Sequence, residues 1–137
     1  AGLAAVPGAR SLTTDAAVPL SLLPEAVTRA ESIFTGQPFV WSMLGHVAEG
    51  NFHALLLFDP ADVVASDAAH GAAKELTREV IALGGTCTGE HGIGLGKRQA
   101  LVDQAGESTV AVMRSIKQAL DPRDILNPGK VLFPVHT

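Results

Sequence analysis

A glycine-bounded turn in the middle of the sequence constrains the fold of this chain more than any other feature. Residues 39–44 and 51–58 are apolar runs, and residues 45–50 between them begin and end with glycine. Because glycine breaks regular structure and permits tight turns, the pattern predicts two strands joined by a turn. His46 and His53 stand at the two mouths of this turn, where their rings can converge on one point.

The rest of the pattern predicts an α+β fold. Apolar residues at helical spacing predict helices over residues 24–34 and 61–83, a short helix over 97–102 and a last helix ending near Leu120. A partly alternating run over residues 12–20 predicts the first strand. The order strand, helix, strand, strand, helix, followed by a glycine-rich stretch where a fourth strand fits, is that of a ferredoxin-like sandwich. We therefore expect an antiparallel sheet with helices on one face and a helical C-terminal tail.

Two of the predicted helices carry an apolar stripe along one face. On the longest helix the stripe consists of Ala65, Ala68, Ala69, Ala72, Leu76, Val80 and Leu83. On the last helix it consists of Val110, Met113, Ile116 and Leu120. These spacings mark the two helices.

Length and composition agree with one domain. The chain has 137 residues, of which 47% are hydrophobic and only 4% aromatic, so its core must come from Ala, Val, Leu and Ile. Residues 1–11 are small and aperiodic, which predicts a flexible lead-in. Residues 12–137 form the predicted domain. The first residue is Ala rather than Met, and we expect a processed chain or a fragment of a longer one.

Composition and missing motifs exclude several function classes. The net charge of −4 provides no basic stripe for nucleic acid, and no apolar run reaches the ~18 residues that span a bilayer. The glycines of residues 92–96 fit neither a P-loop nor a dinucleotide-binding fingerprint. Cys87 has only threonine and glycine around it, so we expect a packed, unreactive thiol.

The two histidines at the turn are the beginning of a metal site. Two neutral imidazoles with a carboxylate and open positions are a common catalytic arrangement for zinc or a neighbouring divalent ion. The turn itself offers no established third ligand, so two ordinary histidines at the end of a hairpin are the alternative interpretation.

The segment TCTGEHGIG, residues 86–94, offers the missing carboxylate. Glu90 and His91 are adjacent in a loop that is flanked by glycine and otherwise uncharged. Because neighbouring side chains diverge, we expect Glu90 to bind the ion and His91 to face the substrate as a general base. A solvent-exposed loop with an incidental Glu–His pair is the alternative.

Three segments resemble the C-terminal region of FAD-linked oxidases of the vanillyl-alcohol oxidase type, in particular the D-lactate dehydrogenase (cytochrome) and glycolate oxidase D subunit group. They are GHVAEGNFH at 45–53, GTCTGEHGIGLGKR at 85–98 and LDPRDILNPGKVL at 120–132. They occur in the family's order. The resemblance runs from about residue 14 to residue 133, which is nearly the whole chain.

The resemblance implies an FAD-dependent 2-hydroxyacid dehydrogenase whose flavin is bound mostly by a separate N-terminal domain, absent from this chain. It implies that His46, His53 and Glu90 bind a divalent metal, usually zinc. It also implies that His91 takes the proton of the α-hydroxyl group while a hydride passes to FAD. The isolated chain would then be inactive.

Further expectations follow from the same resemblance. Asn127 and Lys130 match a tail that returns to the cofactor. Thr13 and Leu55 stand where relatives acting on 2-hydroxyglutarate carry lysine and asparagine, which favours a small acid such as D-lactate or glycolate. The electron acceptor would be a cytochrome, a quinone or an electron-transfer flavoprotein. The location would be cytoplasmic, or mitochondrial in a eukaryote.

Two functions of other classes fit the same residues. One is a stand-alone metal-binding or interaction module that has the fold without redox activity. The other is a metal-dependent hydrolase that uses the same ligands with His91 as the base. A flavin-binding domain encoded ahead of Ala1 would discriminate the dehydrogenase from both.

Overall fold

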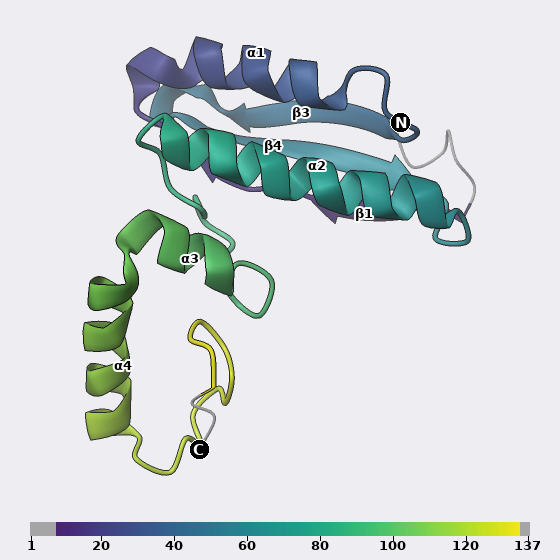
Figure 1. The fold of residues 1–137 in the computed structure, drawn as a ribbon. Coiled ribbons are helices and arrows are strands. Elements are labelled where there is room, and N and C mark those ends of the chain that lie inside the picture. The colour runs from purple at the N-terminus through teal and green to yellow at the C-terminus, as the bar shows by residue number, and fades with distance from the viewer. Residues whose placement is uncertain (1–7, 135–137) are drawn as a thin grey trace. The chain divides into compact units, whose positions relative to one another are not determined.

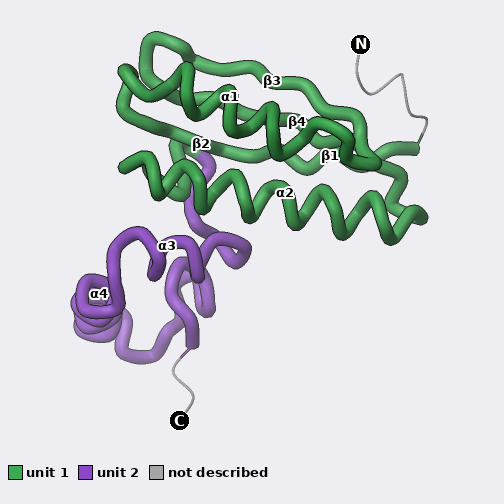
Figure 2. The backbone as a smooth tube through the Cα atoms, turned by 45° about the horizontal axis from the view of Figure 1, so that its top comes forward, with its two compact units in different colours: residues 1–90 green, residues 91–137 purple. Residues whose placement is uncertain are grey.

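A computed structural model describes residues 8–134 of the chain (Figure 1). The chain divides into two compact units, residues 1–90 and residues 91–137 (Figure 2). The strands and α-helices of the first unit are β1 (Arg10–Thr13), β2 (Ala16–Ala17), α1 (Leu23–Phe34), β3 (Val40–His46), β4 (Asn51–Phe58) and α2 (Val63–Ala82). The second unit contains α3 (Arg98–Ala105) and α4 (Glu107–Leu120). The predicted α+β class is confirmed.

Strand β4 is the centre of a four-stranded antiparallel sheet. It pairs with β3 along one side and with β1 and β2 along the other, where the edge is interrupted at Thr14 and Asp15. The expected fourth ferredoxin-like strand is reduced to a single antiparallel bridge between Ala17 and Thr86. One strand of the predicted hairpin, β4, is therefore paired on both sides, and the other, β3, forms an edge of the sheet.

The first strand begins earlier than the sequence predicts. Arg10 and Ser11 pair with Phe58 and Leu57 of β4, so β1 starts two residues before the predicted strand boundary. The lead-in expected over residues 1–11 thus overlaps β1 at its end, because backbone pairing with β4 does not depend on an alternating pattern in β1. Residues 1–7 lie outside the described residues.

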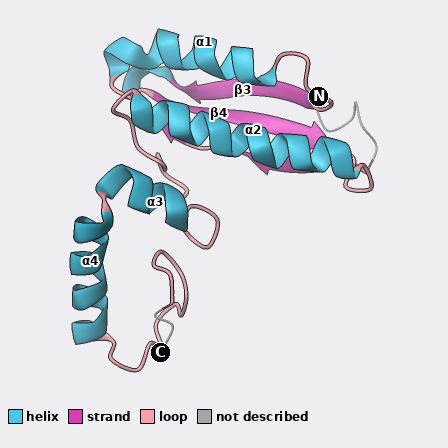
Figure 3. Cartoon of the chain, viewed as in Figure 1, coloured by secondary structure: helices cyan, strands magenta, loops and turns pink. Residues whose placement is uncertain are grey.

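The core of the first unit lies on one face of the sheet, between β4 and the helices α1 and α2 (Figure 3). Four buried residues alternate along β4 toward these helices: Phe52, Ala54, Leu56 and Phe58. Helix α1 has Pro24 in its first turn, where the missing N–H costs nothing. Helix α2 is capped at its start by Asp62, whose side chain accepts a hydrogen bond of 3.0 Å from the backbone N–H of Ala65.

The other face of the sheet carries the remaining side chains of β4. Asn51, His53, Leu55 and Leu57 alternate with the core residues and therefore point away from the helices. Cross-strand partners share a face, so Leu44 and His46 of β3, which oppose His53 and Asn51, lie on this same side. Both histidines of the turn thus belong to the face without helices.

The second unit is held by polar contacts of its tail. Arg98 donates hydrogen bonds to the carbonyls of Leu95 and Gly129, and its guanidinium lies 4.7 Å from the ring centre of Phe133. Arg114 donates to the carbonyl of Phe133 at 2.6 Å. None of the helices in the described part of the chain combines the length and the apolar character that a membrane span requires.

Candidate metal centre

The turn between β3 and β4 brings the two predicted histidines together. A short 3₁₀ segment, Val47–Glu49, leads into Gly50, whose φ is 70°. A Cβ atom at Gly50 would lie 2.3 Å from the carbonyl oxygen of Val18, so both the backbone angle and the contact require glycine. The rings of His46 and His53 end up with their centres 6.3 Å apart and nearly perpendicular, at 89°.

Glu90 completes a possible ligand set. The Nε2 atom of His53 lies 3.1 Å from Oε1 of Glu90, and one ligand atom from each of His46, His53 and Glu90 lies within 4.8 Å of the others. Two ligand atoms that are each about 2.0–2.2 Å from a zinc ion lie about 3 Å apart, so this spacing suits a shared cation. His46 and Glu90 are exposed whereas His53 is buried, which leaves an open side for a substrate.

A hydrogen bond at Nδ1 of His53 leaves Nε2 available to bind a cation. Its Nδ1 atom lies 3.1 Å from the carbonyl oxygen of Thr14. A carbonyl oxygen only accepts hydrogen bonds, so the proton of a neutral imidazole resides on Nδ1 and the lone pair of Nε2 points toward Glu90. Metal-binding histidines commonly show this arrangement.

The loop that carries Glu90 is tied to the interruption between β1 and β2. The buried carboxylate of Asp15 accepts hydrogen bonds from Thr88 Oγ1 at 2.6 Å, from the backbone N–H of Gly89 at 2.8 Å and from that of Glu90 at 3.2 Å. Although Thr14 and Asp15 lie in the region that resembles the family, the sequence offered no reason to assign Asp15 a role in the site. Nothing in the local pattern marks it, because its donors are 73 to 75 residues away in the sequence.

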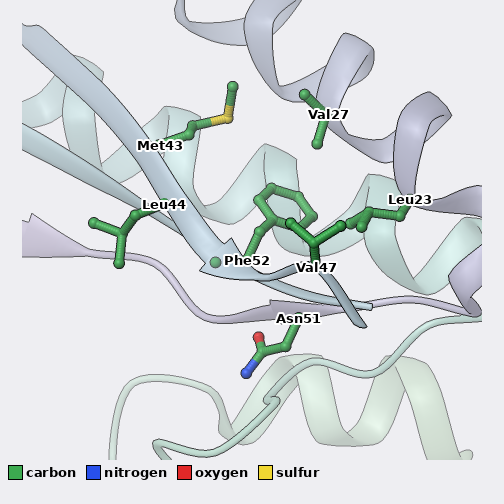
Figure 4. A pocket seen from close by; sticks show the side chains of 8 residues that line it. Leu23, Val27, Met43, Leu44, Val47, Asn51 and Phe52 are labelled. Carbon is green, nitrogen blue, oxygen red and sulfur yellow. The ribbon is translucent and has the colours of Figure 1, made fainter. Parts of the chain in front are cut away.

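An apolar hollow lies beside the same turn (Figure 4). The hollow is a cavity of about 170 Å³ next to the start of α1 and the end of β3. Leu23, Val27, Met43 and Phe52 reach into it from the helix side, whereas Leu44 and Asn51 point the other way. The hollow has no charged lining residue, so it suits neither a cation nor a carboxylate.

The face that carries the histidines has both apolar and polar side chains beyond them. Leu44 opposes His53 directly and is 55% exposed. Thr13 and Leu55, which the sequence analysis connected with substrate size, are direct partners across β1 and β4.

The remaining predicted site residues are in the second unit or at its beginning. His91 directly follows Glu90 and is exposed, and its role as a base stays a prediction. Asn127 and Lys130 are exposed tail residues, joined by a backbone hydrogen bond of 3.1 Å from the Lys130 N–H to the Asn127 carbonyl. Their role in cofactor binding also stays a prediction. Cys87 is 2% exposed, which confirms the packed thiol.

Comparison with known proteins assigns the family. The chain is 42% identical over its whole length to the "Probable D-lactate dehydrogenase, mitochondrial" of Danio rerio, and covers 28% of that protein. It is 40% identical over 91% of its length to the "D-lactate dehydrogenase [cytochrome], mitochondrial" of Kluyveromyces lactis, covering 21%. It is 33% identical over 88% of its length to the "Glycolate oxidase subunit GlcD" of Bacillus subtilis, covering 26%.

The chain thus spans about a quarter of the length of these relatives. Residues 1–131 match the family described as "FAD linked oxidases, C-terminal domain". This match covers far more than half of the sequence and agrees with the α+β fold. The chain belongs to the family of FAD linked oxidases as a C-terminal domain.

Proposed function

We propose that this chain is the metal-binding part of an FAD-dependent 2-hydroxyacid dehydrogenase, and that its cation is zinc or a similar divalent ion. The observation that supports this most is the convergence of His46, His53 and Glu90 within 4.8 Å. The mixture of two imidazoles and one carboxylate is typical of catalytic zinc sites that keep a position open for substrate. The names of the relatives point to D-lactate or glycolate as the substrate.

In this proposal the three ligands hold the cation at the open side of the sheet. A bound divalent cation supplies a Lewis acid for the carboxylate and the α-hydroxyl group of the substrate. The open side at His46 and Glu90 leaves room for the acid to approach. Leu44, exposed next to His53, packs against the short apolar end of the acid and orients it.

His91 receives the proton of the α-hydroxyl oxygen on an imidazole nitrogen in this proposal. Bound FAD supplies the acceptor for the hydride that leaves the α-carbon. Loss of one proton and one hydride converts the 2-hydroxyacid into a 2-oxoacid, so the reaction balances without water. His91 is exposed, so a substrate can reach it, and it directly follows the ligand Glu90.

The proposed enzyme needs residues outside this chain. The sequence contains no phosphate-cradling loop, so we assign most FAD contacts to a separate N-terminal domain, with Asn127 and Lys130 contributing from the tail. The name of the Kluyveromyces lactis relative points to a cytochrome as the electron acceptor. Mitochondrial relatives point to a mitochondrial location in a eukaryote.

The test of this function uses the complete flavoprotein. We expect D-lactate to bleach the flavin absorbance. The kcat/KM for D-lactate should exceed that for 2-hydroxyglutarate, because Thr13 and Leu55 offer no charge to a second carboxylate. Replacing His46, His53 or Glu90 by Ala should remove the bound metal, whereas His70→Ala, an exposed histidine on α2, should not. Full metal content in all three ligand variants would refute the metal centre, and a flavin that no 2-hydroxyacid reduces would refute the enzyme class.

A further inference from the structure

We propose that Thr14 and Asp15 are positioning residues that hold His53 and Glu90 in the orientation that binds the cation. The inference rests on the proposed function, because it concerns the same three ligands. The two residues form the interruption between β1 and β2. The Thr14 carbonyl oxygen lies next to His53, and the Asp15 carboxylate accepts from the Glu90 backbone and lies 3.8 Å from Nδ1 of His53. The two residues between β1 and β2 therefore position two of the three ligands, His53 and Glu90.

Thr14 positions His53 by changing the hydrogen-bond pattern of the sheet. Its backbone N–H donates to the carbonyl of Ala54 at 2.9 Å, as in an ordinary antiparallel pair. The return bond is different, since the N–H of Ala54 donates to the Thr14 hydroxyl oxygen at 2.8 Å. The side chain thus takes the place of the Thr14 carbonyl, which is left to accept from Nδ1 of His53.

Asp15 positions Glu90 through the backbone. Its side chain is 1% exposed, and its two oxygens accept from the hydroxyl of Thr88 and from the N–H groups of Gly89 and Glu90. Hydrogen bonds from neutral donors to an ionised carboxylate are stronger than bonds between neutral groups. These bonds fix the side chain of Thr88 and the backbone of Gly89 and Glu90.

The side chain of Glu90 needs such support. It is 50% exposed, so packing alone does not determine its direction, and the backbone that carries it must do so. The loop also lies in a tight space, because a Cβ atom at Gly89 would be 2.7 Å from Asn51 Oδ1 and 2.8 Å from Asp15 Oδ1. Asp15 therefore holds the loop by hydrogen bonds, and the side chain of Asn51 lies close to Gly89 as well.

The test measures zinc affinity and local order in the complete flavoprotein. Asp15→Asn keeps the size of the side chain but turns an amide NH₂ toward donors. We expect zinc affinity to fall about 10-fold to 100-fold, as for other residues that support metal ligands. In metal-free protein, the amides of Gly89 and Glu90 should exchange with deuterium faster than in the wild type. Thr14→Val removes the hydroxyl that accepts from the Ala54 N–H, so this N–H can compete with His53 for the Thr14 carbonyl. Zinc affinity should therefore fall in this variant too.

Asp62→Ala is the matched control, because it removes an aspartate that caps α2 and has no part in the site. It should lower the thermal midpoint without changing zinc affinity. If Asp15→Asn does not fold, Gly89→Ala serves instead, since it keeps Asp15 and displaces the loop sterically. Wild-type zinc affinity and wild-type amide exchange in these site variants would overturn the proposal. A wild-type protein that binds no zinc would refute the proposed function instead, and amide exchange would still show whether Asp15 holds the loop.

Discussion

The helices α2 and α4 carry similar apolar stripes but have different surroundings. On α2 the five residues Ala65, Ala69, Ala72, Leu76 and Val80 are all buried. On α4 only Val110 is buried, while Met113, Ile116 and Leu120 are 36%, 56% and 79% exposed. Helical spacing therefore predicts which face of a helix is apolar, but not whether another element covers it.

The same contrast separates the two units of the chain. The first unit has a continuous core between its sheet and two helices, and most of its buried side chains are apolar. Among the described residues of the second unit, Val110 is the buried hydrophobic residue, and the tail is held mainly by arginine, lysine and aspartate contacts. We expect the first unit to depend on packing and the second on polar contacts.

The largest expected effect tests this contrast by truncating one side chain in each unit. Phe34 is fully buried in the first unit, with its ring centre 5.6 Å from Trp41 and 6.2 Å from Phe39. Phe34→Ala should cost about 3–5 kcal/mol, since it removes the ring and leaves a cavity. Leu120→Ala should change stability by no more than about 0.5 kcal/mol. Urea unfolding of the 137-residue chain measures both, and an equal cost would show that the α4 stripe is covered in solution.

Much of the first unit could be predicted from the sequence because local patterns determine it. The strand over residues 51–58 has the predicted bounds, and helix α2 lies within the predicted 61–83. The reduction of the fourth strand to the bridge at Ala17 and Thr86 was not predictable, because pairing along an edge depends on neighbours that no local pattern encodes. The exposure of the α4 stripe likewise depends on neighbours and not on a local pattern.

The second prediction concerns Glu90 and His91, the last residue of the first unit and the first of the second. In the complete flavoprotein, Glu90→Ala should lose metal, whereas His91→Ala should keep it. His91→Ala should still lower turnover on the order of 10²-fold, the usual contribution of a general base. Metal analysis and steady-state kinetics on D-lactate measure the two effects. Loss of metal in His91→Ala with retention in Glu90→Ala would mean that the roles are reversed.

The metal ligands of the candidate site could be predicted from residue types and short spacings in the sequence. The turn at residues 45–50 placed His46 and His53 together, and the glycine-flanked Glu90 supplied the carboxylate. Thr14 and Asp15 could not be found in this way. Their contacts with Ala54, His53 and the loop before Glu90 join segments 39 to 75 residues apart, and only the folded sheet brings these together.

The smallest expected effect belongs to the polar contacts of the second unit. Lys117 donates a hydrogen bond to the buried Asp121, whose carboxylate also accepts from the N–H groups of Leu126 at 2.9 Å and Ile125 at 3.1 Å. These contacts, the one with Lys117 first, lower the pKa of Asp121 below its ordinary value, although burial acts in the opposite direction. Folding therefore favours the ionised form of Asp121 over its protonated form.

The pH dependence follows from that direction. A carboxyl group with a lowered pKa contributes stability above its ordinary value of 3.8, and the contribution is lost as the pH falls through the lower value of the folded state. A carboxyl-carbon NMR titration of the 137-residue chain should thus give a midpoint for Asp121 below 3.8. Lys117→Met should raise this midpoint without restoring it fully, because the two backbone donors remain. A midpoint that Lys117→Met leaves unchanged would show that the tail does not depend on this ion pair, and the second unit would then need another source of order.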